Sequence, residues 1–455
     1  MSIKYETDSR KVKPGQIFVA IVGHTVDGHD YIDQAIKNGA SKLIVSKEGN
    51  YGISYEIVND TEEYLTNALV KEYSKEFENM DFIGVTGTNG KTTTCYLIYQ
   101  MLSKLGCSVA YMGTIGFYYQ DKKIILNNTT PDILTIYNLL LEAKEAGIKT
   151  VVMEVSSHSL CYKRIAGLKY KVGGFTNLTE DHLDFHKDLE DYLNAKLKLI
   201  DYLDKDAKML VNSDDEASKK WQDKYYCLTY GENKSNYQII RYDITPSKTT
   251  LEFKYLDDNY QITTNLTSKF NVYNYLLALS IVHEYGYSIN EILDITKDIY
   301  PPKGRCETYE VNDAYAVIDY AHTPDAVEKV IEAYTELKKA RIITIVGCGG
   351  DRDNKKRPIM GGIASDLSDY VIFTNDNPRT EDPNKIMNDI IAGVKKDNYE
   401  IIFDRREAID KAINMLEKDD ILLILGKGHE DYQIIGHEKI HLDDSEEVLK
   451  HIKNQ

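Results

Sequence analysis

Short apolar runs alternate with amphipathic stretches along most of the chain, which is the pattern of an α/β protein. Near the start, residues 16–23 and 41–45 read as strands, and residues 29–39 between them read as a helix ended by glycine. A larger α/β region follows, with expected strands at 82–85, 150–155, 173–178 and 208–212. The run Pro301-Pro302-Lys303-Gly304 then predicts a hinge.

The last third of the chain has three apolar runs with polar or glycine-rich ends. They lie within residues 341–352, 369–379 and 420–430, and helical segments separate them. Strands that alternate with helices form a mostly parallel, doubly wound sheet, and the carboxyl ends of its strands meet at one edge. We therefore expect Arg352, Arg379 and Glu430 to converge on one crevice.

Length and charge limit the classes of function that remain. A chain of 455 residues is long enough for about three domains at ~150 residues each. Its net charge of −17 argues against a broad nucleic-acid or anionic membrane surface. The N-terminus lacks an apolar segment typical of a secretory signal, and no apolar run approaches the ~18 residues of a membrane span. The six cysteines form no CxxC pair, which indicates reduced thiols in the cytoplasm.

The stretch GVTGTNGKTTT (84–94) has the setting of a phosphate loop. It follows an apolar strand and precedes a helix. Glycines let backbone N–H groups approach a phosphate, Lys91 adds positive charge, and Thr92 can bind Mg²⁺. The strict GxxxxGK[ST] pattern fails because Val85 stands at its first position, so a Gly/Thr-rich turn at a helix start is the alternative.

Two strand ends nearby carry groups that suit a metal ion. Glu154 ends the run VVMEV and could hold Mg²⁺, although a carboxylate in that place is often only structural. The stretch TNLTEDHLDFH (176–186) clusters acids with His182 and His186, and its alternative interpretation is a solvated acidic turn. His182 could bind a second cation, but the pattern does not specify a zinc site.

Lys196 interrupts an apolar stripe on the expected helix 187–203. Most such lysines extend their amine to solvent. If Lys196 is instead buried, desolvation lowers its pKa and leaves a neutral amine, which can react with CO₂ to give a carbamate able to support Mg²⁺. Further along, Asn271 and Asn274 open a helix and could read an adenine, while helix capping is the commoner use of asparagine.

The order of the motifs resembles that of the Mur ligases, and within them the branch that adds the third residue to UDP-N-acetylmuramoyl-L-Ala-D-Glu. The motifs span nearly the whole chain, and they are DSRKVKPGQIFVAIVGH (8–24), TGTNGKTTT, NNTTPD (127–132), EVSSH, NLTEDHLDFH, YLNAK, FNVYN, YAHTPDA, GCGGDRD, DNPR and GKGHEDYQ. The resemblance implies an α/β fold of three domains: a UDP-sugar domain (1–78), a central P-loop-type ATPase domain with a mostly parallel sheet (79–302), and a Rossmann-like domain for the incoming amino acid (303–455). It implies that ATP phosphorylates a carboxylate, an amine attacks the acyl phosphate, and ADP and phosphate leave.

The same resemblance assigns roles residue by residue. The implied catalytic residues are Lys91, Glu154, His182 and Lys196. The implied ATP contacts are Gly87, Thr88, Asn89, Gly90, Lys91, Thr92, Thr93, Asn271, Arg305 and Asp319. Mg²⁺ is implied at Thr92, Glu154, His182 and a carbamylated Lys196 (N6-carboxylysine). The implied site for UDP-MurNAc-L-Ala-D-Glu comprises Thr7, Ser9, His24, Thr25 and Val26 at the uridine and Asn128, Thr129, Thr130, Ser156, Tyr162 and Arg164 at the muramoyl peptide.

Arg379 is the residue on which the identity of the incoming amino acid depends. It follows Pro378 at the end of an apolar run, and by itself it could pair with Glu381 or Asp382 in its own turn. The resemblance implies instead that it binds the far carboxylate of meso-diaminopimelate, which a guanidinium can grip through two hydrogen bonds. The other implied contacts to this amino acid are Arg352, Asp376, Asn377, Pro378, Gly426 and Glu430.

Two positions depart from the family pattern and keep alternatives open. Tyr162 stands where the family often has glutamine, and Lys269 replaces the usual glycine before FN. The alternatives are a paralogue that adds L-lysine or another amino acid, a related ligase that acts on a different carboxylate such as a folate, and a regulatory homologue that binds nucleotide without catalysis.

Overall fold

A computed structural model describes residues 2–23 and 26–453, which form two compact units. Unit 1 comprises the chain up to Thr229 together with Ile281–Tyr287, and unit 2 comprises Tyr230–Ser280 and the chain from Ser288 onward. All six cysteines are free thiols. Across the described residues, none of the helices is both long enough and apolar enough to cross a membrane.

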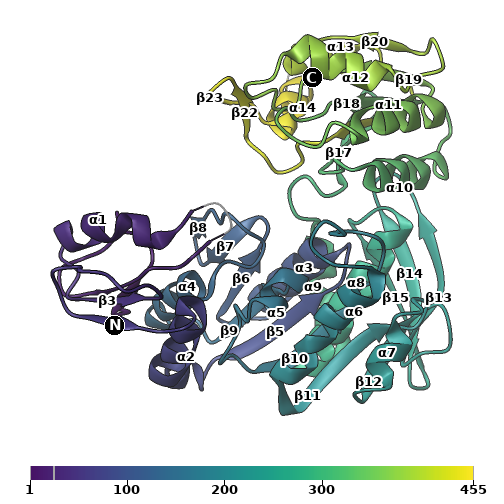
Figure 1. The fold of residues 1–455 in the computed structure, drawn as a ribbon. Helices are drawn as coiled ribbons and strands as arrows, with labels where there is room; N and C mark the ends of the chain where they lie inside the picture. Colours follow the sequence, from purple (N-terminus) through teal and green to yellow (C-terminus); the bar gives the residue numbers. More distant parts are fainter. Residues whose placement is uncertain (1, 24–25, 454–455) are drawn as a thin grey trace. The chain divides into compact units, whose positions relative to one another are not determined.

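Unit 1 begins with a small parallel sheet (Figure 1). Its strands follow the chain in order and are β1 (Tyr5–Glu6), β2 (Ile17–Val19), β3 (Lys42–Val45) and β4 (Tyr55–Ile57). One face packs on α1 (Ile32–Lys37), which the short helix η1 (Gly28–Tyr31) precedes. The other face packs on α2 (Thr61–Tyr73) and η2 (Ser74–Phe77). The expected strand 16–23 therefore ends at Val19, four residues early.

The larger sheet of unit 1 places β5 (Asp81–Thr86) between two parallel neighbours. The strands run in the order β11 (Leu203–Asn212), β10 (Tyr170–Phe175), β5, β9 (Thr150–Glu154), β6 (Val109–Gly113), β7 (Gly116–Tyr119) and β8 (Lys122–Ile124). The pairs from β11 to β6 are parallel, and β7 and β8 are antiparallel. The connecting helices are α3 (Lys91–Lys104), α4 (Ile133–Glu145), α5 (Ser157–Cys161), α6 (Leu189–Leu197), η3 (Lys198–Tyr202) and α7 (Ser218–Gln222). The polar ends of β5, β9 and β10 thus meet at one edge.

The two sheets of unit 1 share a hydrophobic core. Leu65, Leu69 and Phe77, from α2 and η2, are buried together with Phe82 of β5 and Tyr137 of α4. The rings of Phe77 and Tyr137 meet edge to face, with their centroids 5.0 Å apart. The N-terminal sheet is therefore packed against the larger one rather than tethered to it.

Unit 2 begins with an antiparallel ribbon and a long helix. The ribbon consists of β13 (Tyr237–Ile244), β14 (Thr249–Tyr255) and β15 (Asp258–Thr264), and β12 (Cys227–Gly231) pairs with β13 through Tyr230 and Gly231. The helices that follow are α8 (Lys269–Tyr285), which crosses between the units, α9 (Ile289–Ile295) and η4 (Thr296–Asp298).

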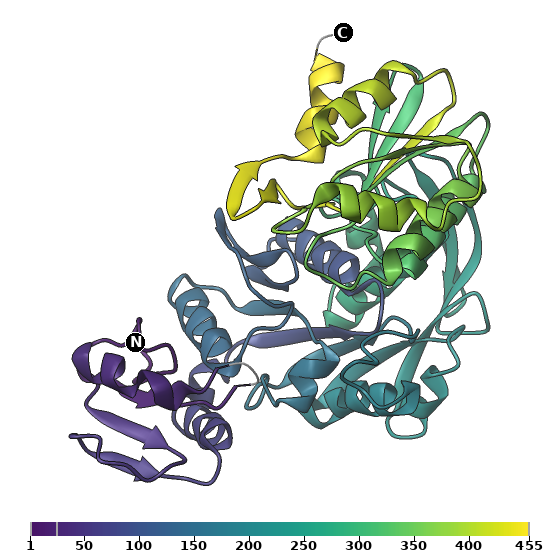
Figure 2. The same ribbon diagram turned by 45° about the horizontal axis from the view of Figure 1, so that its top comes forward.

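The main sheet of unit 2 is doubly wound, as the sequence predicted. Its order is β16 (Glu307–Val311), β17 (Ala314–Asp319), β21 (Ile421–Leu425), β18 (Ile342–Val346), β19 (Tyr370–Phe373) and β20 (Tyr399–Ile401), and every pair except β16–β17 is parallel. One face packs on α10 (Pro324–Thr335), α11 (Lys356–Leu367) and α12 (Pro383–Ile391). The other face packs on α13 (Arg405–Asn414) and α14 (Asp444–Lys453). The hairpin of β22 (Tyr432–Ile435) and β23 (Glu438–His441), drawn in yellow, is a separate ribbon of this unit (Figure 2).

Candidate functional site

The loop from Gly87 to Gly90 joins the end of β5 to the start of α3 and has the backbone geometry of an anion cradle. Gly87 has a φ of +143°, and a Cβ there would lie 1.9 Å from Thr176 Oγ1, so only glycine fits. Gly90 caps α3 with a left-handed φ of 86°. The loop is tied to the end of β10, because Thr88 N donates to Asn177 O (2.8 Å) and Asn89 N to Asn177 Oδ1 (3.0 Å). The N-terminus of α3 then presents its backbone N–H groups beside this loop, where a phosphate can bind.

Two lysines bond to one carbonyl of this loop. Lys91 Nζ donates to Gly87 O (3.0 Å) and Thr88 O (2.9 Å), and Lys196 Nζ donates to Gly87 O (2.8 Å). Lys196 is 1% exposed, and its Nζ lies 4.0 Å from the centre of the Tyr192 ring. Burial, reinforced by the charge of Lys91, lowers the pKa of Lys196 well below its ordinary value. The amine therefore does not reach solvent, and Lys196 is buried, which was the less common of the two alternatives for a lysine in an apolar stripe.

Glu154, at the end of β9, is buried with donors on both carboxylate oxygens. Thr92 Oγ1 donates to Oε2 (2.9 Å), Thr114 N to Oε1 (2.8 Å) and the Tyr111 hydroxyl to Oε1. A Cβ at Gly113 would lie 2.1 Å from Oε1, so the carboxylate occupies space that only glycine leaves. Tyr111, Gly113 and Thr114 were not predicted from the sequence. The small residues that end the apolar run 109–113 were the available signal.

His182 has a strained backbone and lies in a group of aromatic rings. Its φ is +55°, and its carbonyl accepts the backbone N–H groups of Phe185 (3.0 Å) and His186 (2.9 Å). Its ring meets that of His158 edge to face with centroids 4.9 Å apart. Burial lowers the pKa of His182, and the charges of Lys91 and Lys196 lower it further. The charge of Asp181 opposes this fall in the pKa of His182.

The predicted Mg²⁺ ligands are only partly assembled in this structure. Thr92 and Glu154 are in direct contact, and both offer the oxygen donors that Mg²⁺ prefers. Among residues 2–23 and 26–453, however, no group of three or more His, Cys, Asp and Glu side chains is placed to hold a metal. The structure brings the predicted ligands into one region without assembling them into a coordination shell.

The residues predicted for the muramoyl peptide meet at the end of β9. Thr130 Oγ1 donates to Glu154 O (2.7 Å) and accepts from Ser156 N (3.2 Å). Arg164 Nη1 donates to Thr130 O (2.9 Å), and its guanidinium lies 5.4 Å from the centre of the Tyr162 ring. Thr129 Oγ1 is 3.0 Å from Thr114 Oγ1, and Asn128 is exposed.

The described residues predicted for uridine, Thr7, Ser9 and Val26, lie in loops beside the small N-terminal sheet. Ser9 is buried and its carbonyl accepts from Asn38 Nδ2 (2.8 Å), while Thr7 N donates to Glu6 Oε1 (2.8 Å). Val26 is 52% exposed. The predicted residues His24 and Thr25 lie outside the described residues.

In unit 2, Asn271, Arg305 and Asp319, which are predicted for ATP, lie at the start of α8, just before β16 and at the end of β17. Asp319 is buried and accepts from Cys306 N (2.8 Å) and Ala321 N (2.9 Å); burial raises its pKa, and the Arg305 charge opposes that rise. The Arg305 guanidinium lies 4.7 Å from the centre of the Tyr320 ring, and among the described residues its buried Nε has no hydrogen-bond partner. Asn271 Nδ2 donates to Thr267 O (2.9 Å), so this amide group already serves the helix start.

The turn Asp376–Arg379 follows β19, and an isolated parallel β-bridge joins Arg379 to Ile435 of the β22 hairpin. Arg379 has a φ of +53°, its N donates to Ile434 O (3.0 Å), and its O accepts from Gly436 N (2.7 Å). Asn377 Nδ2 donates to Glu430 Oε2 (2.9 Å), and Ile434 N donates to Asn377 Oδ1 (2.9 Å). Pro378 therefore lies between two residues whose positions are fixed from outside the turn.

The ends of β18, β19 and β21 converge as their order in the sheet requires. A Cβ at Gly349 would lie 2.9 Å from Arg379 Nη1 and 3.8 Å from Arg352 Cγ, so both arginines border the loop after β18. A Cβ at Gly426 would lie 2.8 Å from Asp376 Oδ2. With the contact between Asn377 and Glu430, these approaches bring the predicted amino-acid residues to one edge of the sheet.

Arg379 does not use the acids of its own turn. Its Nη1 donates to Gly350 O (2.9 Å) and Asn377 O (3.4 Å), and within the described part of the chain no carboxylate is at ion-pair distance from it. Glu381 pairs instead with Arg357, whose guanidinium is wholly buried. The sequence did not predict a role for Arg357 or for Lys427, whose buried Nζ lies 3.4 Å from Glu430 Oε2.

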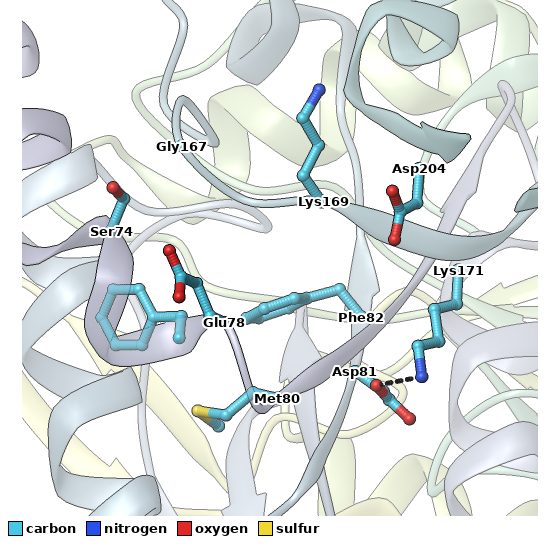
Figure 3. Close-up of a pocket in the computed structure, with 10 residues that line it drawn as sticks. Ser74, Glu78, Met80, Asp81, Phe82, Gly167, Lys169, Lys171 and Asp204 are labelled. Carbon is cyan, nitrogen blue, oxygen red and sulfur yellow. Dashed lines mark ion pairs between the residues drawn. The ribbon is translucent and has the colours of Figure 1, made fainter. Parts of the chain in front are cut away.

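A hollow of about 140 Å³ in unit 1 lies elsewhere (Figure 3). Its lining includes Asp81, Phe82, Lys169, Lys171 and Asp204, and Lys171 Nζ pairs with Asp81 at 2.6 Å. These residues come from the amino ends of β5 and β10, whereas the loop and Glu154 lie at the carboxyl ends. This hollow is not part of the candidate site.

Three segments of the chain match domain patterns of one family. Residues 5–77 match the pattern described as Mur ligase family, catalytic domain, residues 85–282 match the Mur ligase middle domain, and residues 304–428 match the Mur ligase, glutamate ligase domain. The matches run in the same order as the motifs and leave only short stretches between them.

Curated relatives match over almost the whole chain. The chain is 41% identical to UDP-N-acetylmuramoyl-L-alanyl-D-glutamate–2,6-diaminopimelate ligase 1 of Clostridium acetobutylicum, with 98% of this chain and 94% of that protein covered. It is 43% identical to the ligase of the same name from Fusobacterium nucleatum subsp. nucleatum, with 98% and 93% covered. A solved structure of a ligase of this name superimposes with a TM-score of 0.72 at 31% identity and covers 99% of this chain and 94% of its own.

Proposed function

Because the chain belongs to the Mur ligase family, with its three-domain α/β fold, we propose that it is an ADP-forming amide ligase of peptidoglycan precursor synthesis. In this proposal it joins meso-diaminopimelate to the γ-carboxylate of D-Glu in UDP-MurNAc-L-Ala-D-Glu. The support is a sequence identity of 41% and 43%, over nearly the full length, to relatives named for this reaction. We place the reaction in the cytoplasm, where free thiols such as these six persist.

The proposed division of labour follows the three segments of the chain. Residues 1–78 bind the UDP sugar, residues 79–302 carry the ATP-dependent chemistry, and residues 303–455 select the amino acid. The polar groups described at the sheet edges are consistent with this division, because α/β proteins bind ligands at the carboxyl ends of their strands.

The reaction proceeds in two covalent steps. The γ-carboxylate oxygen of D-Glu attacks the γ-phosphorus of ATP, and the bond from that phosphorus to the bridging oxygen breaks to release ADP. The amine of the incoming amino acid then attacks the acyl carbon, loses a proton and expels inorganic phosphate, which leaves an amide. Both steps move negative charge onto phosphoryl and carbonyl oxygens. Lys91 and the N-terminus of α3 stabilise that charge.

The residues near the loop fit Mg²⁺ and a carbamate. Thr92 and Glu154 supply adjacent hard oxygen donors, and the proposed set is completed by His182 and a carbamate on Lys196. A bound Mg²⁺ would supply charge neutralisation at the phosphates. The buried Lys196 amine has a lowered pKa, so its neutral form can take up CO₂ and release a proton. Tyr192 covers this amine, and Gly87 O accepts its hydrogen bond.

We infer the identity of the incoming amino acid from the hydrogen bonds of Arg379. Its guanidinium is fixed by carbonyl oxygens and pairs with no carboxylate among the described residues. Meso-diaminopimelate carries a carboxylate at the end distant from the reacting amine, whereas L-lysine carries only an ammonium there. An arginine in this state attracts the former and repels the latter. Glu430 would accept the distal ammonium, with Arg352, Asp376, Asn377, Pro378 and Gly426 around it.

The first test of this proposal is the dependence of ADP release on the two co-substrates. We expect ADP release only when UDP-MurNAc-L-Ala-D-Glu and meso-diaminopimelate are both present, with a product whose mass equals their sum less one water. ADP release with a folate in place of the UDP sugar would point to the related ligase. Nucleotide binding without turnover of any amino acid would point to the regulatory homologue.

A further inference from the structure

One peptide group separates Arg379 from the carboxylate nearest to it in sequence. Arg379 Nη1 donates to the carbonyl oxygen of Gly350 (2.9 Å), and the N–H of the same peptide unit, that of Asp351, donates to Glu381 Oε2 (3.1 Å). The guanidinium and the carboxylate therefore lie on opposite sides of the Gly350–Asp351 peptide. Left to Coulomb attraction alone, the two groups would pair directly.

Glu381 is held on its own side by the buried Arg357, while the exposed Lys385 amine lies 3.4 Å from its Oε1. Arg357 Nη2 donates to Oε2 (2.6 Å) and Nη1 to Oε1 (2.9 Å), which is the two-bond geometry of a strong arginine–carboxylate pair. Arg357 is wholly buried in the first turn of α11, and its Nη1 also donates to Asp389 of α12 (2.9 Å). This pairing lowers the pKa of Glu381 to about 2, so the carboxylate stays charged under any working condition.

The two sides of the peptide are also fixed by backbone contacts. Gly350 N donates to Asn377 O (2.9 Å), and Thr380 N donates to Asp351 Oδ2 (3.1 Å). A Cβ at Gly350 would lie 1.9 Å from Pro378 O, so the loop can approach the turn only with glycine there. These contacts hold the loop and the turn in place, and within that fixed frame Arg357 supplies the two-bond partner of Glu381.

We propose that Arg357 is a specificity-determining positioning residue, which withholds Glu381 from Arg379 and so leaves the Arg379 guanidinium open to the carboxylate of the incoming amino acid. This inference rests on the proposed function. Arg357 itself touches no substrate in this account. Its effect is to remove an internal competitor for the cation that the substrate needs.

The test is a mutant cycle on Arg357 and Glu381, read with meso-diaminopimelate and L-lysine. In Arg357→Gln, Glu381 loses its two-bond partner and keeps only the exposed Lys385 amine and the Asp351 N–H, so it can turn toward Arg379. The KM for meso-diaminopimelate should then rise about fivefold, the size of a partly exposed ion pair. The KM for ATP should stay within about twofold of its wild-type value, because substitutions at distant, independent sites couple weakly. Adding Glu381→Gln to this variant removes the competitor and should return the KM for meso-diaminopimelate to near its wild-type value, while Glu381→Gln alone should change it little.

A merely structural Arg357 gives a different pattern. In that case Arg357→Gln lowers thermal stability, affects both substrates alike and is not rescued by Glu381→Gln, and this pattern would overturn the inference. An unchanged KM in Arg357→Gln would overturn it too. If Arg357→Gln does not fold, Arg357→Lys keeps a cation in the same space without the two-bond geometry. A smaller rise in KM that Glu381→Gln reverses would support the inference, and no rise would overturn it. Wild-type enzyme that fails to use meso-diaminopimelate rejects the proposed function instead.

Discussion

The loop of unit 1 and the Arg379 turn of unit 2 each hold a cation, Lys91 and Arg379, on backbone carbonyl oxygens, but the two regions are built in different ways. In the loop, Lys91 and Lys196 bond to carbonyl oxygens of one short segment, and burial with mutual repulsion lowers the pKa of Lys196. In the turn, acids are abundant, and Arg357 binds the one that Arg379 would otherwise pair with. Lys91 thus bonds to carbonyl oxygens three and four residues before it, whereas the availability of Arg379 depends on Arg357 from a different helix.

The largest expected effect comes from removing the loop cation. Lys91→Ala should lower the rate of ADP formation at least about a thousandfold, because charge on the transferring phosphoryl group loses a preorganised donor. Circular dichroism should show an unchanged fold. Lys104→Ala, at the exposed end of the same helix, is the matched control and should retain normal activity. Near-normal ADP formation by Lys91→Ala would reject the loop as the ATP site.

Lys196→Ala tests whether the second lysine of the loop acts through a carbamate. We expect a loss of roughly a hundredfold in kcat, the scale of one lost electrostatic contact in an active site, with partial rescue by small carboxylates. ¹³C NMR of the wild-type enzyme in ¹³C-bicarbonate should show a carbamate signal that Lys196→Ala lacks. Lys198→Ala, two residues on and exposed, is the control. Wild-type enzyme without a carbamate signal would contradict this assignment.

Arg379→Ala tests whether the turn of unit 2 binds the distal carboxylate of the incoming amino acid. Losing the partner of a desolvated charge costs about 2–5 kcal/mol, so kcat/KM for meso-diaminopimelate should fall at least about thirtyfold. The affinity for ATP should not change, because the loop belongs to a different part of the chain. Arg241→Ala, on the exposed face of β13, serves as the control. A variant with unaltered selectivity would show that Arg379 does not contact the substrate.

The smallest expected effect concerns the support of Glu154. Thr114→Val removes the donor that lies 3.1 Å from Oε2 and leaves the other donors in place. One hydrogen bond to a charged group is worth about 1.5–3 kcal/mol. Because the backbone N–H of Thr114 still donates, we expect only about a fivefold rise in the Mg²⁺ concentration needed for half-maximal activity. Thr263→Val, exposed on β15, is the control. An unchanged Mg²⁺ requirement would separate Glu154 from metal binding.

The sequence predicted the strand, the glycine loop and the helix around Lys91 well because these segments are contiguous. It also predicted the parallel sheet of unit 2 and hence the edge at which Arg352, Arg379 and Glu430 meet. It could not decide whether Lys196 reaches solvent, because an apolar stripe on a helix fits a buried amine and an extended one equally well. Only the packing of Tyr192 and the position of Gly87 O decide that question.

The partners of Arg379 were beyond the reach of the sequence for another reason. Sequence proximity favours Glu381 and Asp382, yet the partner of Glu381 comes from α11, 24 residues away. The β22 hairpin that bonds to Arg379 is more distant still, and no apolar alternation marks it as a strand pair. Competition between charges depends on contacts that only the folded chain brings together.

The central claim is that this enzyme selects an amino acid with a second carboxylate, and the direct measurement is the ratio of kcat/KM for meso-diaminopimelate to that for L-lysine. Both should be assayed on wild-type protein with ATP and UDP-MurNAc-L-Ala-D-Glu. The account predicts a preference for meso-diaminopimelate of at least about thirtyfold, the effect of one desolvated charge pair. Equal use of the two amino acids, or a preference for L-lysine, would contradict it.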